Sequence, residues 1–393
     1  MTDRGRQLRQ AFVGGFALFL VSVVSLSGYS LWRLRAEAIA DSLQVAALHS
    51  RSFENFLTQS LRVAEQSASN ITVMGTDRVS LERLEATFTT ALRQTPFLRS
   101  MSLQDASGRI VASSNPANIG ITVATQDYLP IAGQAAEILR IGQPWRGRDF
   151  SNGRLATPSN PVEADAQGFI PLTRSVGAGG QALSLLIAIN PDYFINTLVE
   201  ALDSESDQVD VLRYDGVLLM GTAANTRAGT SHEKLVKNLQ LSTRESGNFE
   251  QTETGTAASL TAFRVSRLYP FVVITRLDRD LALAQWRTEA RALIGVLTPA
   301  LLAIVLMATA FYRRLMEGAR QRAAAERLLR INATVFDTSS EAILITDASA
   351  NIISANGAFT RITGYTEQEV IGRNPRLLAS GVPGELSWLT GGR

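Results

Sequence analysis

Two long uncharged stretches constrain this chain more than any other feature of its sequence. No residue from Gln10 to Trp32 carries a charge, and neither does any residue from Ala292 to Tyr312. Each stretch reaches the roughly 20 residues that a helix needs to cross about 30 Å of hydrocarbon. We therefore predict two transmembrane helices, at residues 11–32 and 291–312. Aromatic rings, which prefer the membrane interface, stand at the ends of both stretches: Tyr29, Trp32, Phe311 and Tyr312.

Arginines after the second stretch predict which side of the membrane each part faces. They follow it closely, at Arg313, Arg314, Arg320, Arg322, Arg327 and Arg330. Because cytoplasmic flanks carry an excess of Lys and Arg, the C-terminal part is predicted to be cytoplasmic. Two crossings then place residues 1–10 in the cytoplasm too, and residues 33–290 outside it. The predicted location is the cytoplasmic (inner) membrane, multi-pass, with an extracytoplasmic region between the helices.

Each stretch also has an alternative interpretation. For the first it is a cleaved signal peptide, since Arg4, Arg6 and Arg9 form a basic start and small residues surround Leu26. The uncharged run is longer than the apolar core of an ordinary signal peptide, and cleavage would leave residues 33–290 outside in either case. For the second it is a buried core helix, against which the length and the lack of a polar face argue.

The composition excludes several kinds of function. The formal net charge of the 393 residues is only +2, so nothing supports a nucleic-acid partner. The chain has no Cys, which removes disulfides, thiolate nucleophiles and Cys-based metal sites. Its histidines, His49 and His232, stand in no cluster with metal-ligand spacing. We predict no metal site and no catalytic residue.

A heptad-like pattern follows the first stretch and predicts one long helix over residues 34–73. Small and apolar residues recur there in steps of four and three. Such a stripe can pack against the helix's own domain or against a second copy of the chain, and both can hold along one helix. The positions are Ile39, Leu43, Ala46, Ser50, Phe53, Leu57, Ser60, Ala64, Ser67 and Ile71.

A strand–turn–strand pattern then occurs three times. Its turns lie at Asp105–Gly108, at Asp215–Gly216 and, past the second stretch, at Asp347–Ser349. Recurrence at domain-sized intervals suggests three related α+β modules, although a generic hairpin gives a similar pattern.

Further elements are predicted around these hairpins. A helix is expected at 191–202, with Pro near its first turn. Residues 141–161, rich in Gly, Pro, Asn and Arg, are expected to form a long loop, which is usually functional or disordered. Strands are expected at 169–176, 182–189, 247–251, 257–265 and 271–276.

The region outside the membrane resembles the double Cache sensors, which carry two PAS-like modules in tandem. The nearest subtype precedes diguanylate cyclases and cyclic-di-GMP phosphodiesterases. The resemblance covers roughly residues 34–285 and implies a distal module at about 74–185 and a proximal module at about 186–285. Its motifs in chain order are SMSLQDASGRIVASS (100–114), IG (119–120), DY (127–128), IGQP (141–144), NPDYF (190–194) and LRYDG (212–216).

The resemblance also implies a small-molecule partner. The family binds small ligands, often amino or organic acids, in the membrane-distal module. Candidate ligand-binding residues are Tyr128, Trp145, Arg148 and Arg174, because an aromatic wall with guanidinium groups suits a carboxylate. The alternative is that these arginines are solvated and these aromatics belong to the core. The full amino-acid-binding pattern of some Cache receptors is not evident, so the ligand class stays open.

Residues 313–338 are predicted to continue the second transmembrane helix as a signalling linker. Ala324, Leu328, Ile331 and Val335 repeat in steps of four, three and four. Such a seam fits parallel helices of a homodimer, and packing on the next domain is the alternative.

Residues 341–376 strongly resemble the first half of a PAS domain. There Asn356 is predicted to cap a short helix carrying Phe359 and Ile362, and Gly364 to end it with positive φ. Beyond position 380 the resemblance stops. We expect an incomplete cytoplasmic PAS module at 339–393, in a truncated, frameshifted or incompletely sequenced protein, because the remaining sheet would leave its edges unpaired.

The PAS resemblance limits the cofactors. Light-sensing PAS domains form a Cys–flavin adduct at the position that matches Pro375, which has no thiol. Haem PAS domains usually need an axial His, and no histidine lies beyond His232. We expect neither a Cys-adduct flavin nor a His-ligated haem, and no other cofactor is evident.

No output enzyme is recognisable in this sequence. It has no GGDEF or EAL segment, no P-loop and no nucleophile–base pair, and both histidines are predicted to lie outside the cytoplasm. The leading hypothesis is a receptor that forms the input part of a cyclic-di-GMP protein. The alternatives are the input part of a sensor histidine kinase and a non-catalytic dimerisation partner of a full-length relative. The coding DNA beyond Arg393 would separate them.

Overall fold

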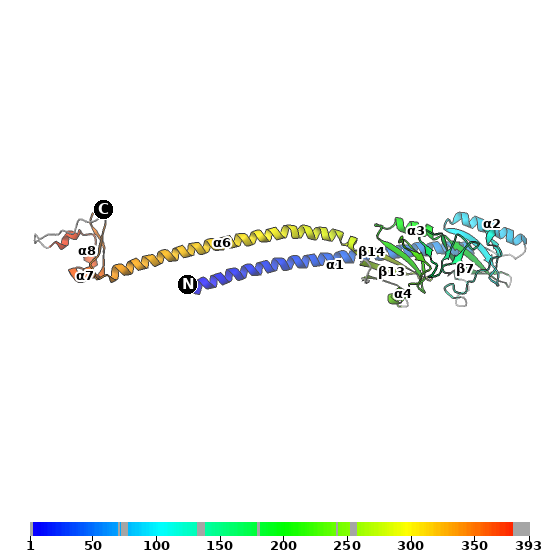
Figure 1. Cartoon of the computed structure of the whole chain (residues 1–393), viewed down its shortest axis with the longest axis horizontal. Coiled ribbons are helices and arrows are strands. Elements are labelled where there is room, and N and C mark those ends of the chain that lie inside the picture. The colour runs from blue at the N-terminus through cyan, green and yellow to red at the C-terminus, as the bar shows by residue number, and fades with distance from the viewer. Residues whose placement is uncertain are drawn as a thin grey trace. The chain divides into compact units, whose positions relative to one another are not determined.

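The computed structural model describes residues 3–69, 71, 78–131, 138–178, 181–240, 243–251 and 258–379. The chain forms two compact units, residues 1–293 and 294–393. Both contain helices and sheet, as the prediction of an α+β fold requires. Two helices are long and apolar enough to cross a membrane, α1 (Asp3–Ser69) and α6 (Ala284–Thr338), and each contains one predicted span (Figure 1).

The distal sheet has the strand order β2-β1-β8-β7-β4-β5, with β3 paired to β7. The helix α2 (Arg78–Gln94) packs against β1 and β2, and the short helix η1 (Pro116–Asn118) follows β2. The distal sheet runs to Ile189, past the predicted module boundary. The strands are β1 (Leu98–Gln104), β2 (Ile110–Ser113), β3 (Arg140–Ile141), β4 (Trp145–Arg146), β5 (Arg154–Leu155), β7 (Gly168–Ala178) and β8 (Gln181–Ile189).

The segment 141–161 is more ordered than the predicted loop. It holds the short strands β4 and β5 and the end of β3, which add to the β7 edge of the distal sheet. Strands of two residues leave no alternation in the sequence, which is why a composition rich in turn residues predicted none. The segment is therefore a folded rim of the sheet.

The proximal sheet has the strand order β10-β9-β14-β13-β12, all antiparallel. The helix α3 (Pro191–Glu200) leads into it and α4 (Glu233–Leu239) lies after β11 (Arg227–Ala228). Its last strand leads through α5 (Arg279–Ala282) directly into α6. The strands are β9 (Gln208–Arg213), β10 (Leu218–Gly221), β12 (Ser246–Gln251), β13 (Ser259–Val265) and β14 (Phe271–Asp278).

The predicted heptad stripe lies on one face of α1 and packs against the sheets of the first unit. Ala46 joins a core cluster with Leu260, Ala262 and Leu277 of the proximal sheet. Further along, the stripe enters the large core that both modules share. Buried members of the stripe in that core are Phe53, Leu57, Ala64 and Ile71. Of the two arrangements left open by the sequence, packing within the chain accounts for this face.

Arg213 joins the two modules. Its side chain lies on β9 and is only 2% exposed. In the distal module, Nη1 donates to the carbonyl oxygens of Ile141 at 3.1 Å and Asp127 at 3.2 Å. Nε and Nη2 bind the Asp215 carboxylate at 3.0 and 2.5 Å. Because a buried guanidinium is costly unless its N–H groups are bonded, these contacts hold the distal loops on the proximal sheet. A second link is the pairing of β6 (Val162–Glu163) with β11.

The three predicted Asp turns share one geometry. Oδ1 of Asp105 accepts the N–H groups of Ser107 and Arg109, and Oδ1 of Asp347 accepts those of Ser349 and Asn351, all at 2.8–3.0 Å. Asp215 accepts from the N–H of Val217 at 3.3 Å. Hydrogen bonds to the ionised form favour it, so the Ser107 hydroxyl and backbone N–H groups lower the pKa of Asp105.

The C-terminal unit contains a small core built from the PAS-like segment. Ile352, Ala355, Phe359 and Val370 are buried together. As predicted, the Asn356 side chain accepts from the Phe359 N–H at 2.9 Å, and Gly364 ends the helix with φ +81°. The elements after α6 are β15 (Leu344–Thr346), β16 (Ile352–Ala355), α7 (Gly357–Thr363), α8 (Glu367–Val370) and η2 (Pro375–Leu378).

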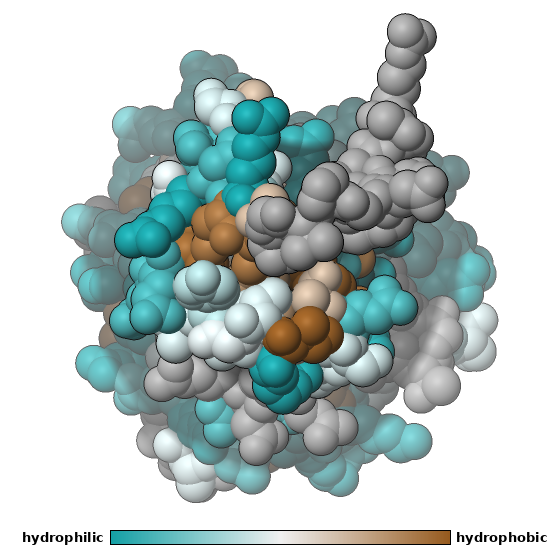
Figure 2. Space-filling view, turned by 90° about the vertical axis from the view of Figure 1, so that its left-hand side faces the viewer, coloured by the Kyte–Doolittle hydropathy of each residue, from teal (hydrophilic) through white to brown (hydrophobic). Residues whose placement is uncertain are grey.

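Apolar side chains remain at the surface of the C-terminal unit. Ile345, Ile353, Ile362 and Ile371 are each 49–65% exposed. Figure 2 looks at this unit and shows hydrophobic residues among hydrophilic ones. The predicted PAS module also includes residues 380–393, which lie outside the described residues.

Replacing the buried link between the modules tests its importance. We expect Arg213→Gln to lower the free energy of unfolding by about 2–3 kcal/mol, because the shorter side chain leaves carbonyl groups of the distal module without donors. Urea denaturation of the full chain in detergent, followed by circular dichroism, measures this loss. The control is Arg267→Gln, which removes an exposed ion pair with Glu245 and should change little. Equal effects of the two changes would refute the proposed link.

Candidate functional site

The distal sheet has one face packed on α1 and an opposite face that carries polar and aromatic groups. Along β7, Phe169, Pro171 and Thr173 alternate onto this second face. Trp145 pairs with Phe169 across β4 and β7, with ring centroids 5.7 Å apart. The ring of Tyr128 lies against Gly142 and Pro171, so close that a Cβ on Gly142 would meet it at 2.6 Å. The lack of a side chain at Gly142 therefore makes room for the Tyr128 ring on this face.

Three polar groups on this face are buried without a hydrogen-bond partner among the described residues. They are the Tyr128 hydroxyl, the Trp145 indole N–H and the Thr173 hydroxyl. Buried polar groups are bonded in more than nine cases of ten, so each is expected to meet water or a ligand. Burial raises the pKa of the Tyr128 hydroxyl, which therefore stays a neutral O–H able to donate and accept.

Arg140 holds the loop that carries Tyr128 through hydrogen bonds to its backbone carbonyl groups. The Arg140 Nε donates to the Pro130 carbonyl at 2.7 Å, and Nη2 donates to the carbonyls of Thr125 and Tyr128 at 2.8 and 2.9 Å. Arg213 bonds the neighbouring carbonyl of Asp127. The position of the tyrosine ring is therefore fixed by two arginines, one from each module.

A buried polar network next to this face was not predicted. Asp149, only 6% exposed, accepts from the Ser100 hydroxyl at 2.6 Å, the Asn115 amide at 2.8 Å and the Phe150 N–H at 2.8 Å. Asn118, fully buried, accepts from the Ser151 N–H at 2.9 Å. Since both oxygens of the carboxylate are bonded, the network anchors the loop behind Trp145 and Phe150 on β1. No sequence pattern links these residues, which extend along the chain from Ser100 to Ser151.

The predicted ligand-binding residues separate into two groups. Tyr128 and Trp145 lie on the same face and carry unsatisfied polar groups. Arg148 is exposed at the rim, where its carbonyl lies 3.4 Å from Arg99 Nη1. Arg174 lies on the other face of β7, where Nη1 donates to the Glu65 carbonyl of α1 at 3.1 Å and to the Ser69 hydroxyl. The structure does not bring Arg174 together with the others, and ligand binding by all four stays a prediction.

The chemistry of this face lies in hydrogen bonds that the described residues leave unmet, from two hydroxyl groups and an indole N–H. The rings of Trp145, Phe150 and Phe169 pack together beside these groups in one core cluster. Within the described ranges, no three His, Asp or Glu side chains lie together as a metal site would require.

Comparison with known proteins gives a fold for each unit. The model of the PAS fold matches residues 332–386. Nitrogen fixation regulatory proteins of Klebsiella oxytoca and Klebsiella pneumoniae are 55% and 53% identical over 47 residues, which are 12% of this chain. The chain spans only 10% of the length of these curated relatives.

For the first unit the similarity is structural. The crystal structure of the extracellular domain of rpHK1S-Z16, a proposed histidine kinase, aligns with a TM-score of 0.50 and 16% identity, over 63% of this chain and 98% of that domain. At such identity the match shows the fold of an extracellular domain of this kind. The ligand-binding domain of the Pseudomonas aeruginosa amino acid chemoreceptor PctB, in complex with L-Arg, aligns with a TM-score of 0.41 and 14% identity, over 63% of this chain and 98% of that one.

Removing one hydroxyl distinguishes an unsatisfied group from a bonded one. We expect Tyr128→Phe to change the free energy of unfolding by less than about 0.5 kcal/mol, because its O–H has no hydrogen-bond partner among the described residues. The control is Ser102→Ala, which removes a buried 2.8 Å bond to Ser113 and should cost about 1 kcal/mol. Urea denaturation of both variants measures the difference. A larger loss for Tyr128→Phe would mean that the tyrosine is a structural donor.

Proposed function

We propose that this chain is a membrane-bound signal-transduction receptor with a double Cache region outside the membrane. Its distal module senses a small ligand, and the membrane helices relay the change to the PAS module inside. The observation that carries this proposal is the continuity of α1. One uninterrupted helix contains the apolar block at its start and the core stripe of both modules further along.

The sensing part of the proposal is supported by the unsatisfied groups on the distal face. Tyr128, Trp145 and Thr173 carry polar groups that no described residue bonds. Amino acids and small organic acids are the proposed ligand class, because the resemblance to double Cache sensors implies such ligands. Arg148 at the rim is the proposed contact for a carboxylate.

The relay part is supported by the path from sheet to membrane. The strand β14 ends at Asp278, whose carboxylate accepts from the N–H groups of Asp280 and Leu281 and so begins α5. The helix α6 starts two residues after α5, and the indole of Trp286 donates to the Leu31 carbonyl of α1 at 3.1 Å. A displacement of the proximal sheet therefore reaches both helices at the same level.

A second copy of the chain is the proposed partner of the linker. Leu328, Ile331 and Val335 are 50–61% exposed on α6, so no described part of this chain covers the predicted seam. Parallel pairing of two linkers would bury it. Sedimentation of the full chain as a monomer in detergent would remove this part of the proposal.

The proposed output is that of a cyclic-di-GMP protein, of which this chain is the input part. The support is the resemblance of the extracytoplasmic motifs to the Cache subtype that precedes such enzymes. The input part of a sensor histidine kinase is the second candidate, favoured by the fold that the first unit shares with the rpHK1S-Z16 domain. A non-catalytic partner of a full-length relative is the third. We propose a PAS module without a Cys-adduct flavin or His-ligated haem, since Pro375 stands at the adduct position.

Ligand screening tests the sensing proposal. We expect an amino or organic acid to raise the melting temperature of the full chain in detergent, since a ligand at 100 times its Kd adds about 2.7 kcal/mol. Tyr128→Phe should weaken that ligand about fivefold, the value of one hydrogen bond of about 1 kcal/mol. Arg267→Gln, on the exposed surface of the other module, should bind normally. Absence of any stabilising compound would contradict sensing by this class.

Fusion reporters test the membrane orientation. We expect alkaline phosphatase to be active when fused in the turn at residues 203–206 and inactive when fused after residue 338, because only the first position lies outside the cytoplasm in the proposed topology. Green fluorescent protein at the same positions is the converse control. Cytoplasmic placement of residues 203–206 would end the receptor proposal.

A further inference from the structure

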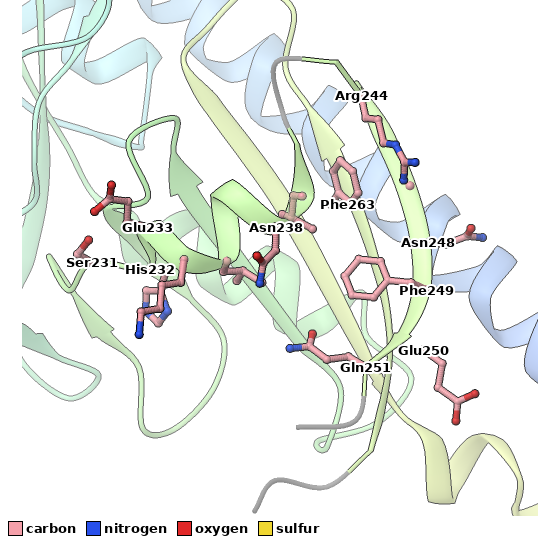
Figure 3. Close-up of a pocket in the computed structure, with 14 residues that line it drawn as sticks. Ser231, His232, Glu233, Asn238, Arg244, Asn248, Phe249, Glu250, Gln251 and Phe263 are labelled. Carbon is pink, nitrogen blue, oxygen red and sulfur yellow. The ribbon is translucent and has the colours of Figure 1, made fainter. Parts of the chain in front are cut away.

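The proximal module has a groove on the face of its sheet that points away from α1. Two adjoining hollows, of about 980 and 570 Å³, lie between this face and α4, and they share His232, Leu235 and Gln251. Figure 3 shows the larger one, with Phe249 and Gln251 turned inward and Glu250 turned away. The groove is separate from the distal face described above, because it lies on the other sheet.

One end of the groove is apolar. Phe249 and Phe263 come from the neighbouring strands β12 and β13, and Leu235 and Leu239 come from α4 (Figure 3). Phe249 is only partly buried although it packs on a core of Leu and Phe residues. An apolar body placed here would cover exposed ring surface, which is favourable in proportion to the area removed from water.

The other end presents a fixed guanidinium. Arg276 lies on β14, 22% exposed, and Nη1 is paired with the Asp210 carboxylate of β9. Among the described residues, Asp210 is the one partner of this arginine, which leaves further N–H donors of the guanidinium for another acceptor. The Gln208 side chain lines the same end. An arginine held by one acid and open on its remaining donors suits a second carboxylate, which it can bind with paired hydrogen bonds.

The charges around the groove favour an anion. Three acids line it, and each is already engaged: Glu233 pairs with Lys237 at 2.6 Å, Glu250 pairs with Arg279 at 2.7 Å, and Asp278 caps α5. Lys234 and Arg244 also line it, and within the described ranges no acid lies within ion-pair distance of either. An added carboxylate would therefore meet positive charge that no acid pairs, whereas an added cation would find the lining carboxylates already engaged.

We infer that this groove is a second ligand site, for a small organic anion. The occupant is an amphipathic monocarboxylate whose carboxylate binds Arg276 and whose apolar body lies against Phe249 and Phe263. Because β14 carries Arg276 and leads into α5 and α6, such an occupant acts on the strand that is connected to the second membrane helix.

Calorimetric titration of the full chain in detergent tests the site with phenylacetate and hexanoate. The neutral control is phenylacetamide, which keeps the shape of phenylacetate and lacks its charge. We expect saturable binding of the acids and at least about tenfold weaker binding of the amide. Arg276→Gln should lower the affinity for phenylacetate by a similar factor, and Phe249→Ala should lower it as well. Arg267→Gln and Tyr128→Phe should leave it unchanged.

Several outcomes would overturn the inference. They are no saturable binding of either acid, equal affinity for the acid and the amide, and full affinity in Arg276→Gln. If the circular dichroism spectrum shows that Arg276→Gln is unfolded, the affinity of Phe249→Ala for phenylacetate tests the site instead. That variant alters an edge strand and leaves the Arg276–Asp210 pair in place. Loss of phenylacetate binding in Tyr128→Phe alone would move the site to the distal module, which would overturn this inference and leave the proposed function intact.

Discussion

The packing of both sheets in the first unit depends on one stripe of α1. Small residues make this possible, because Ala46, Ser50 and Ala64 are fully buried and let the sheets approach the helix closely. The Ser50 hydroxyl lies 2.9 Å from Thr275 Oγ1 and donates to the Ala262 carbonyl at 3.2 Å, so even the polar member of the stripe is satisfied inside the core. The helix that contains the first predicted span is therefore also a central core element of both modules. Neither module has a complete core without α1.

Local signals in the sequence predicted local structure well. The three Asp turns, the Asn356 cap and the positive φ of Gly364 all arise from residues within four positions of one another, and each is confirmed in the structure. Long strands such as β7 and β8 also leave a readable pattern. The short strands within 141–161 do not, since two residues cannot show a period of two. The choice between internal packing and dimer packing of the α1 stripe depends on what the distant sheets present, and no local pattern contains that information.

The prediction of the candidate site rested on residue type. Tyr128 and Trp145 were predicted as an aromatic wall beside guanidinium groups that suit a carboxylate, and ligand binding by them stays a prediction. Arg174 was predicted on the same chemistry, but the face of β7 on which it lies follows from the strand register, which pairs Arg174 with Leu185 and turns it toward α1. Thr173, one position earlier, lies on the opposite face. The network around Asp149 joins the strand β1, the η1 segment and the loop at 149–151 by long-range contacts, so it became visible only in the structure.

The hydrogen bond between the Trp286 indole and the Leu31 carbonyl limits how α1 and α6 can move relative to each other. It fastens the beginning of α6 to α1 at one height. A lengthwise slide that stretches this 3.1 Å contact beyond about 3.5 Å loses the bond, because hydrogen bonds weaken steeply with distance. A swivel around the same point keeps it. Of the relative movements of α1 and α6, rotation about this contact therefore keeps the bond and sliding along the helix axes breaks it.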